Sequence, residues 1–196
     1  MSDLLIIPWG RTDWGDARRL IGRTDLPLND AGRAQVDDWA AQLLDAPPAL
    51  LQYGPEEAAR ETARLLSRRL GLRSGRPIGD LAEMDVGLWA GLTPADVEQR
   101  FTSAYDDWRN SPESVCPPEG EPVADALRRI ERAAQRSLRK HAQSRVGFVV
   151  GPMAAAALRC KLEEGAMERF WEYVDAPAAP YRLTWPRATQ AAGTGS

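Results

Sequence analysis

The segment VGFVVGPMAAAALRCKL, residues 146–162, decides the fold class. Its first five residues, Val146–Val150, are mostly residues that favour β-structure, and they predict a strand. The alanine-rich residues that follow Gly151 favour a helix. A strand that leads directly into a helix is typical of α/β folds with a parallel sheet, so further strand–helix pairs are expected in the chain.

Two earlier parts of the chain repeat this order. Residues 4–7 form a short apolar run that predicts a strand buried on both faces, and after a loop the apolar spacing predicts a helix over about residues 30–44. Residues 50–53 predict a second short strand, followed by a helix that starts near Pro55 and stops at Gly71. The alternation predicts an α/β fold, a three-layer α/β/α sandwich with a mostly parallel central sheet.

Two further helices are expected between the helix that stops at Gly71 and the strand over residues 146–150. Thr93 provides the N-cap signal for one of them. Residues 123–141 are amphipathic, and Arg128, Arg132 and Arg136 lie on the polar face of that helix. Because the chain is acidic overall, we interpret these arginines as a solvated helix surface rather than as a nucleic-acid site.

The length and charge of the chain limit the classes of function. Its 196 residues, 43% hydrophobic and 27% charged, suit one domain, expected over residues 1–186, with a disordered tail over 187–196. A net charge of -3 gives no general attraction for nucleic acid. No apolar stretch reaches the roughly 20 residues that span a bilayer, and the amino terminus has no leader pattern. We therefore expect a cytoplasmic protein that binds neither nucleic acid nor membrane.

Metal and redox chemistry have few candidate residues. The chain has one histidine and two cysteines, Cys116 in a proline-rich loop and Cys160 in an apolar helical segment. Two such cysteines suit a reducing compartment better than a disulfide framework. We expect no metal site and no cofactor.

The expected fold indicates where a site would lie. Ligands of α/β sheets bind beyond the carboxyl ends of the strands, so the candidate segments are residues 8–11, 54–58 and 151–154. The first of these contains Trp9, in LLIIPWGRTDW, where an apolar run ends abruptly at a proline and a tryptophan.

Five other segments match a known family in their order along the chain. They are GRTDLPLNDAGRAQ (residues 22–35), ARETARLL (59–66), EMDVGLWAGLTPADVEQRF (83–101), PPEGEP (117–122) and ERFWEYVDAPAAPYRLTW (168–185). Together they resemble the histidine phosphatase superfamily, most closely its branch of cofactor-dependent phosphoglycerate mutases and related small phosphatases. The resemblance covers nearly the whole chain, and it implies the fold of that family with a phosphate pocket at the strand ends.

The chain departs from the family's pattern at the nucleophile. Members open the first strand with an Arg-His-Gly-Glu-Thr type of motif, whose histidine is phosphorylated during turnover. The matching residues of this chain are Pro8, Trp9, Gly10, Arg11 and Thr12. The resemblance therefore matches the nucleophilic histidine to Trp9 and the phosphate-binding arginine before it to Pro8. An indole has no lone pair that can attack phosphorus.

Three further positions of the family's pocket can be matched. The second phosphate arginine matches Ala58, and the late histidine, which stabilises the transferring phosphoryl group, matches Pro152. Only the family's proton donor remains, as Glu83 in EMDVG. Glu56 and Glu57 nearby disfavour a phosphate dianion. We therefore expect that catalysis is lost, that no residue is catalytic, and that Glu83 is a vestigial acid.

The expected former phosphate pocket consists of Pro8, Trp9, Gly10, Arg11, Ala58, Glu83 and Pro152. Trp9 either stacks on a planar ligand or fills the space that the phosphate has left. Filling is favoured because an empty cavity costs stability. Glu83 either serves altered chemistry or persists as a hydrogen-bonded structural group. Arg11 either binds an anion or forms a surface ion pair.

These alternatives lead to competing functions. The first is a catalytically inactive pseudophosphatase that binds a protein partner or serves as a structural subunit, with Trp14, Tyr105 and Trp108 as candidate interface residues. The second is a small-molecule sensor or a repurposed enzyme that uses the former phosphate pocket. Residual phosphatase activity is the third. The sequence leaves the partner, the ligand and the oligomeric state open.

Overall fold

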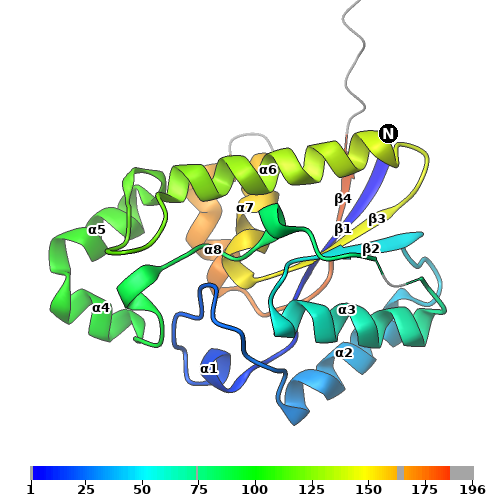
Figure 1. Ribbon diagram of the computed structural model, residues 1–196, viewed down its shortest axis with the longest axis horizontal. Coiled ribbons are helices and arrows are strands. Elements are labelled where there is room, and N and C mark those ends of the chain that lie inside the picture. Colours follow the sequence, from blue (N-terminus) through cyan, green and yellow to red (C-terminus); the bar gives the residue numbers. More distant parts are fainter. Residues whose placement is uncertain (1, 74, 163–165, 186–196) are drawn as a thin grey trace, which may run out of the picture.

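The computed structural model describes residues 2–73, 75–162 and 166–185. Its strands are β1 (Ser2–Pro8), β2 (Leu50–Tyr53), β3 (Val146–Val150) and β4 (Tyr181–Trp185). They form a four-stranded sheet in the order β2-β3-β1-β4 (Figure 1). β1, β2 and β3 run parallel, whereas β4 pairs antiparallel with β1. The prediction of a mostly parallel α/β sheet is confirmed, while the tail expected over 187–196 lies outside the described residues.

Helices cover both faces of the sheet, which forms the middle of three layers. One face is covered by α2 (Asp30–Leu43) and α3 (Glu57–Leu70). The other face is covered by α6 (Val123–Lys140), α7 (Pro152–Leu162) and α8 (Phe170–Asp175). The shorter elements are α1 (Asp13–Asp16), α4 (Pro94–Arg100), α5 (Thr102–Asn110) and the 3-10 turns η1 (Gly79–Leu81), η2 (Gly87–Trp89), η3 (Pro112–Ser114) and η4 (Ala166–Arg169). Among the described helices, none has the length and apolar character needed to cross a membrane.

The central strand β1 is apolar along most of its length because both of its faces are buried. Leu4 and Ile6 belong to the hydrophobic cluster on the α6 and α7 side. Leu5 and Ile7 belong to the cluster under α2 and α3. This alternation follows from the strand geometry, in which successive side chains point to opposite faces. Burying each such side chain contributes about 1.5–3 kcal/mol. Because its side chains enter both clusters, β1 contributes to the core on each side of the sheet.

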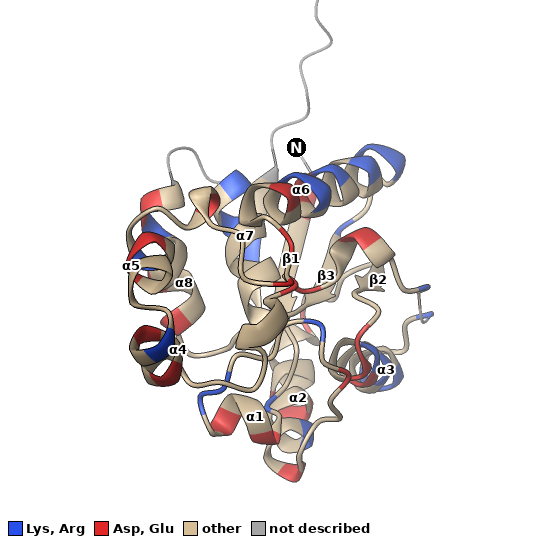
Figure 2. Ribbon diagram, turned by 60° about the vertical axis from the view of Figure 1, so that its left-hand side comes forward, with Lys and Arg blue, Asp and Glu red and all other residues tan. Residues whose placement is uncertain are grey.

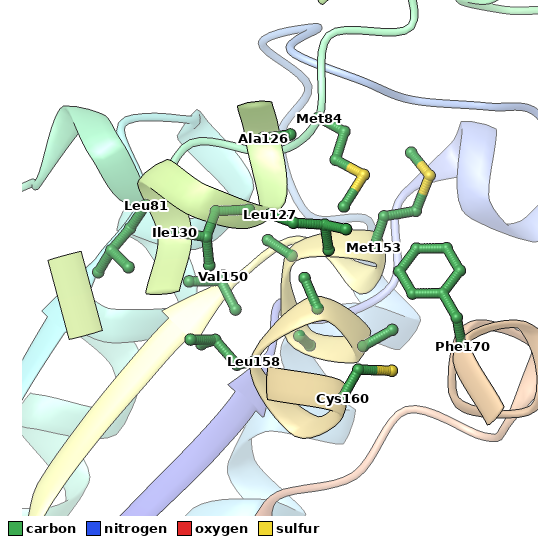
Figure 3. Packing of buried hydrophobic residues seen from close by; sticks show 14 of the residues in the cluster. Leu81, Met84, Ala126, Leu127, Ile130, Val150, Met153, Leu158, Cys160 and Phe170 are labelled. Atoms are coloured by element: carbon green, nitrogen blue, oxygen red, sulfur yellow. The ribbon is translucent and has the colours of Figure 1, made fainter. Parts of the chain in front are cut away.

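The core beside α7 depends on the small residues of that helix. Figure 3 shows Leu127 and Ile130 of α6 pointing toward Val150 of β3 and the beginning of α7, with Phe170 of α8 close to Met153. Residues 154–157 of α7 are four consecutive alanines, all buried. Their short side chains let the neighbouring helices and the sheet approach α7 closely. The alanine-rich segment that predicted a helix therefore also decides how that helix packs.

The helix ends follow most of the sequence signals. Thr93 forms a capping box at the start of α4, as predicted. Gly71 adopts the left-handed conformation, with φ 66°, and ends α3 as predicted. α3 begins at Glu57 rather than near Pro55, and Glu56 occupies its N-cap position without a side-chain cap. The carboxylate of Glu56 is turned toward the edge of the sheet instead.

Candidate functional site

The carboxyl ends of β1, β2 and β3 bring the three candidate segments together. Trp9, directly after β1, donates its backbone N–H to the carbonyl of Val150 at 2.9 Å. Gly54, directly after β2, donates in the same way to the carbonyl of Val149 at 2.9 Å. The segments that follow the three parallel strands therefore meet at one edge of the sheet, where the fold predicts a site.

The side chain of Trp9 is buried at this edge. It is 4% exposed and belongs to the same apolar cluster as Ala58. A Cβ atom on Gly151 would lie 2.8 Å from atom Cη2 of Trp9, so the ring packs against the backbone there and only glycine fits. The backbone N–H of Gly10 donates to the Thr62 hydroxyl at 3.0 Å and anchors the segment after Trp9. This burial favours the alternative in which Trp9 fills the former pocket.

Glu83 lies on the same side of Gly151 as Trp9, since the Cβ atom that would meet the Trp9 ring would also overlap the Glu83 carboxylate, and this carboxylate lies at the start of α7. Its side chain is 1% exposed, and its carboxylate accepts the backbone N–H groups of Met153 at 2.9 Å, Ala154 at 2.9 Å and Met84 at 2.7 Å. The first turn of a helix leaves N–H groups without intrahelical partners, and the helix dipole favours a negative group there. Glu83 thus occupies donors with which this helix would otherwise hold an anion.

A second buried carboxyl group, that of Glu56, contacts Glu83. Glu56 is 4% exposed; its Oε1 accepts the backbone N–H of Glu83 at 2.7 Å, while its Oε2 has no hydrogen-bond partner among the described residues. Burial raises the pKa of Glu83 to about 8; the charge of Glu56 adds to the rise, and the three N–H donors oppose it. Burial also raises the pKa of Glu56, against the hydrogen bond from Glu83. The pair is a poor environment for further negative charge.

Two arginines hold the backbone of Glu83. Arg23 and Arg129 both donate to its carbonyl oxygen, at 3.2 and 2.8 Å. Glu121 accepts from both arginines, at 3.0 and 2.5 Å. Burial acts to raise the pKa of Glu121, but the hydrogen bonds from Arg129 and from the backbone of Asp85, together with the charges of the two arginines, outweigh it and leave this pKa below its usual range. Sequence reasoning missed both arginines, because the contacts join segments that are far apart in the chain.

Pro8 and Pro152 lie at the same edge and line a separate cleft of about 130 Å³. A proline has no backbone N–H with which to bind an anion. The guanidinium group of Arg159 lies over the rings of Tyr173 and Tyr181, 3.7 and 3.9 Å from their centroids, in the wall of this cleft. In the described part of the chain, no three His, Cys, Asp or Glu side chains gather as metal ligands do.

Comparison with known proteins identifies the family. The family model of the histidine phosphatase superfamily, branch 1, matches residues 4–192. The chain belongs to this superfamily. A bifunctional protein of Mycobacterium tuberculosis is 34% identical over 134 residues, which cover 68% of this chain and 36% of that protein. The chain therefore spans about a third of the length of the first curated relatives it matches, 36% in each case.

A further curated relative matches part of the chain, and a solved structure extends the likeness to nearly the whole of it. A glucosyl-3-phosphoglycerate phosphatase of Mycolicibacterium vanbaalenii is 31% identical over 110 residues, which cover 55% of this chain and 47% of that protein. The solved structure of a mycobacterial glucosyl-3-phosphoglycerate phosphatase in complex with VO3 has a TM-score of 0.80 at 25% identity and covers 94% of this chain and 93% of its own. These matches agree with the three-layer architecture.

Arg11 and Glu57, which the sequence places near the pocket of this superfamily member, form ion pairs at the surface. Arg11 pairs with Asp16 at 2.7 Å, and its side chain is 52% exposed. Its hydrogen bond lowers the pKa of Asp16. Glu57 pairs with Arg60 at 3.0 Å, whereas the neighbouring Glu56 faces inward. These contacts favour the surface ion-pair alternative for Arg11.

The three aromatic residues that the sequence offered as candidate interface residues are at least partly buried in this superfamily member. Trp108 is 2% exposed, and its ring centroid lies 5.0 Å from that of Trp89 and 4.4 Å from that of Trp171. The prediction that Trp108 is exposed for a partner is wrong, because α5 turns this side chain into the core. Trp14 and Tyr105 are half-buried.

Proposed function

We propose that this histidine phosphatase superfamily member does not catalyse phosphoryl transfer and acts by binding a protein partner or as a structural subunit. The observation that carries the proposal is the buried ring of Trp9, at the position that the resemblance matches to the nucleophilic histidine. The chemistry of the nucleophile and the electrostatics of the pocket both support it.

The chain offers no nucleophile of the family's kind at this edge. The lone pair of the Trp9 indole nitrogen belongs to the aromatic system, so it cannot attack phosphorus. The single histidine, His141, follows the last residue of α6, at the opposite end of the sheet from Trp9. Cys160 is buried in the cluster around α7. Each of these placements supports the loss of a covalent phosphoryl intermediate.

The pocket also disfavours the substrate. An incoming phosphate would have to displace the Glu83 carboxylate from three backbone N–H groups. The pKa of Glu83, raised to about 8, leaves its carboxyl group protonated at neutral pH, and hydrogen bonds to a neutral group contribute about 0.5–1.5 kcal/mol each, so the displacement costs a few kcal/mol. Ala58, Pro8 and Pro152 supply no positive charge that would offset this cost.

Hydrolysis is the decisive measurement, because the relatives include proteins named as phosphatases. The substrates are p-nitrophenyl phosphate and 3-phosphoglycerate, and the matched control is Glu83→Gln purified in the same way. We expect the same background rate for both proteins. A general acid contributes about 10²–10⁴-fold, so a wild-type rate that exceeds that of Glu83→Gln by such a factor would overturn the proposal.

A small-molecule sensor or a repurposed enzyme is the second candidate, and the cleft beside Pro8 and Pro152 favours it. A thermal-shift scan of a metabolite library tests it, because a ligand at about 100 times its dissociation constant adds about 2.7 kcal/mol to stability. A shift that is lost in Trp9→Phe places the ligand at Trp9, and a shift that persists favours the cleft. If no compound in the library raises the unfolding temperature, this result counts against the second candidate.

A further inference from the structure

Two long segments of this acidic chain contain no acidic residue. Residues 62–78 carry five arginines and no Asp or Glu. Residues 132–162 carry seven Lys or Arg and no Asp or Glu. The net charge of -3 therefore conceals a strong separation of charge along the sequence. Figure 2 shows the same separation in space, with Lys and Arg gathered on α6 and α3 and with Asp and Glu prominent on α1, α4 and α5.

The two basic segments meet around the edge strand β2. The loop after α3 runs along β2, where the backbone N–H of Ile78 donates to the carbonyl of Tyr53 at 2.8 Å. Asp80, two residues further on, pairs with Arg136 of α6 at 2.5 Å and accepts from Arg129 at its carbonyl oxygen. The end of α3, this loop and α6 thus form one surface. Its exposed arginines, here named the basic band, are Arg68, Arg73, Arg76, Arg132, Arg136 and Arg139.

Part of the basic band is hollowed. A hollow of about 320 Å³ is lined by Asp80, Asp125, Arg128, Arg129, Arg132 and Arg136. Arg128 pairs with Asp125, and Arg129 is committed to Glu121. Arg132 forms no salt bridge with any described residue. The same holds, within the described ranges, for Arg68, Arg73, Arg76 and Arg139.

We propose that the basic band is the docking surface for an acidic segment of a protein partner. The fork of a guanidinium group matches a carboxylate, and Arg136 and Arg128 already pair with aspartates at this surface. Neither residues 62–78 nor residues 123–145 contain a Phe, Trp or Tyr on which bases would stack, which favours a carboxylate ligand over a single-stranded nucleic acid. The inference rests on the proposed function, since it names the partner class that replaces catalysis.

Fluorescence anisotropy with a labelled poly-glutamate peptide tests the docking surface. The test variant is Arg132→Glu with Arg139→Glu. The control is Arg18→Glu with Arg100→Glu, which changes the net charge equally at exposed positions on the acidic side of the molecule. We expect the test variant to bind at least ~10-fold more weakly and the control to stay within about 2-fold of wild type, since Coulomb attraction between exposed charges is short-ranged in salt. Thermal unfolding of both variants shows that each is folded.

Several results would overturn the docking surface. They are absence of peptide binding to the wild type, equal weakening in the control variant, and tighter binding of a single-stranded or duplex oligonucleotide than of the peptide. The hydrolysis assay is independent of these results, because no residue of the basic band lies at the Trp9 edge. Failure of peptide binding therefore leaves the loss of catalysis standing, and hydrolysis by the wild type leaves the docking surface standing.

Discussion

Glu83 gives this protein an unusual pH dependence of stability. Burial, with the charge of Glu56, raises the pKa of Glu83 from 4.5 to about 8 in the folded protein. Between these values the folded chain holds a proton that the unfolded chain has released. The free energy of unfolding therefore falls as the pH rises through this range. The stabilisation from this proton is complete below about pH 4.5 and is lost as the pH passes 8.

The size of this loss of stability follows from the difference between the pKa values of Glu83 in the unfolded and folded states. One pH unit corresponds to about 1.4 kcal/mol when one proton separates the two states, so an interval from 4.5 to about 8 gives a loss on the order of 5 kcal/mol. A typical domain has a free energy of unfolding of roughly 5–15 kcal/mol. The titration of Glu83 thus affects a large part of the stability.

Urea unfolding followed by tryptophan fluorescence, at pH values between 5 and 8, measures the effect. The wild type should lose about 1 kcal/mol or more per pH unit, and Glu83→Gln should lose much less because its side chain cannot titrate. Glu57→Gln is the matched control, since this glutamate pairs with Arg60 at the surface, and its slope should equal that of the wild type. A wild-type stability that is flat or rises between pH 5 and 8 would refute the reasoning.

Three further substitutions test the packing of the site and of the helices by urea unfolding. Trp9→Ala should lower the free energy of unfolding by about 3–5 kcal/mol through the cavity it leaves; a loss below about 1 kcal/mol would contradict the filling role. Gly151→Ala should cost about 1–3 kcal/mol, because its Cβ overlaps the Glu83 carboxylate, and an unchanged midpoint would contradict this close contact. Thr93→Ala should cost about 1 kcal/mol, whereas the exposed Thr102→Ala serves as its control.

The pattern of buried strands and helix signals was readable along the chain. The apolar runs of β1 and β3 predicted strands because both faces of these strands are buried, and Gly71 and Thr93 marked helix ends through backbone geometry. The order of the strands then predicted which segments meet at one edge. β4 was not predicted, although Tyr, Thr and Trp in its sequence YRLTW favour β-structure, because its pairing with β1 is a contact between the two ends of the chain.

The sequence by itself determined which residue types stand at the strand ends, including Trp9 and Glu83. Only the tertiary structure decided where their groups point: Trp9 into the core, the Glu83 carboxylate onto the first turn of α7, and Trp108 inward. The physical reason is the separation along the chain between the residues that interact. Strand and cap signals depend on residues a few positions apart, whereas burial, pKa shifts and the basic band depend on segments that packing alone brings together.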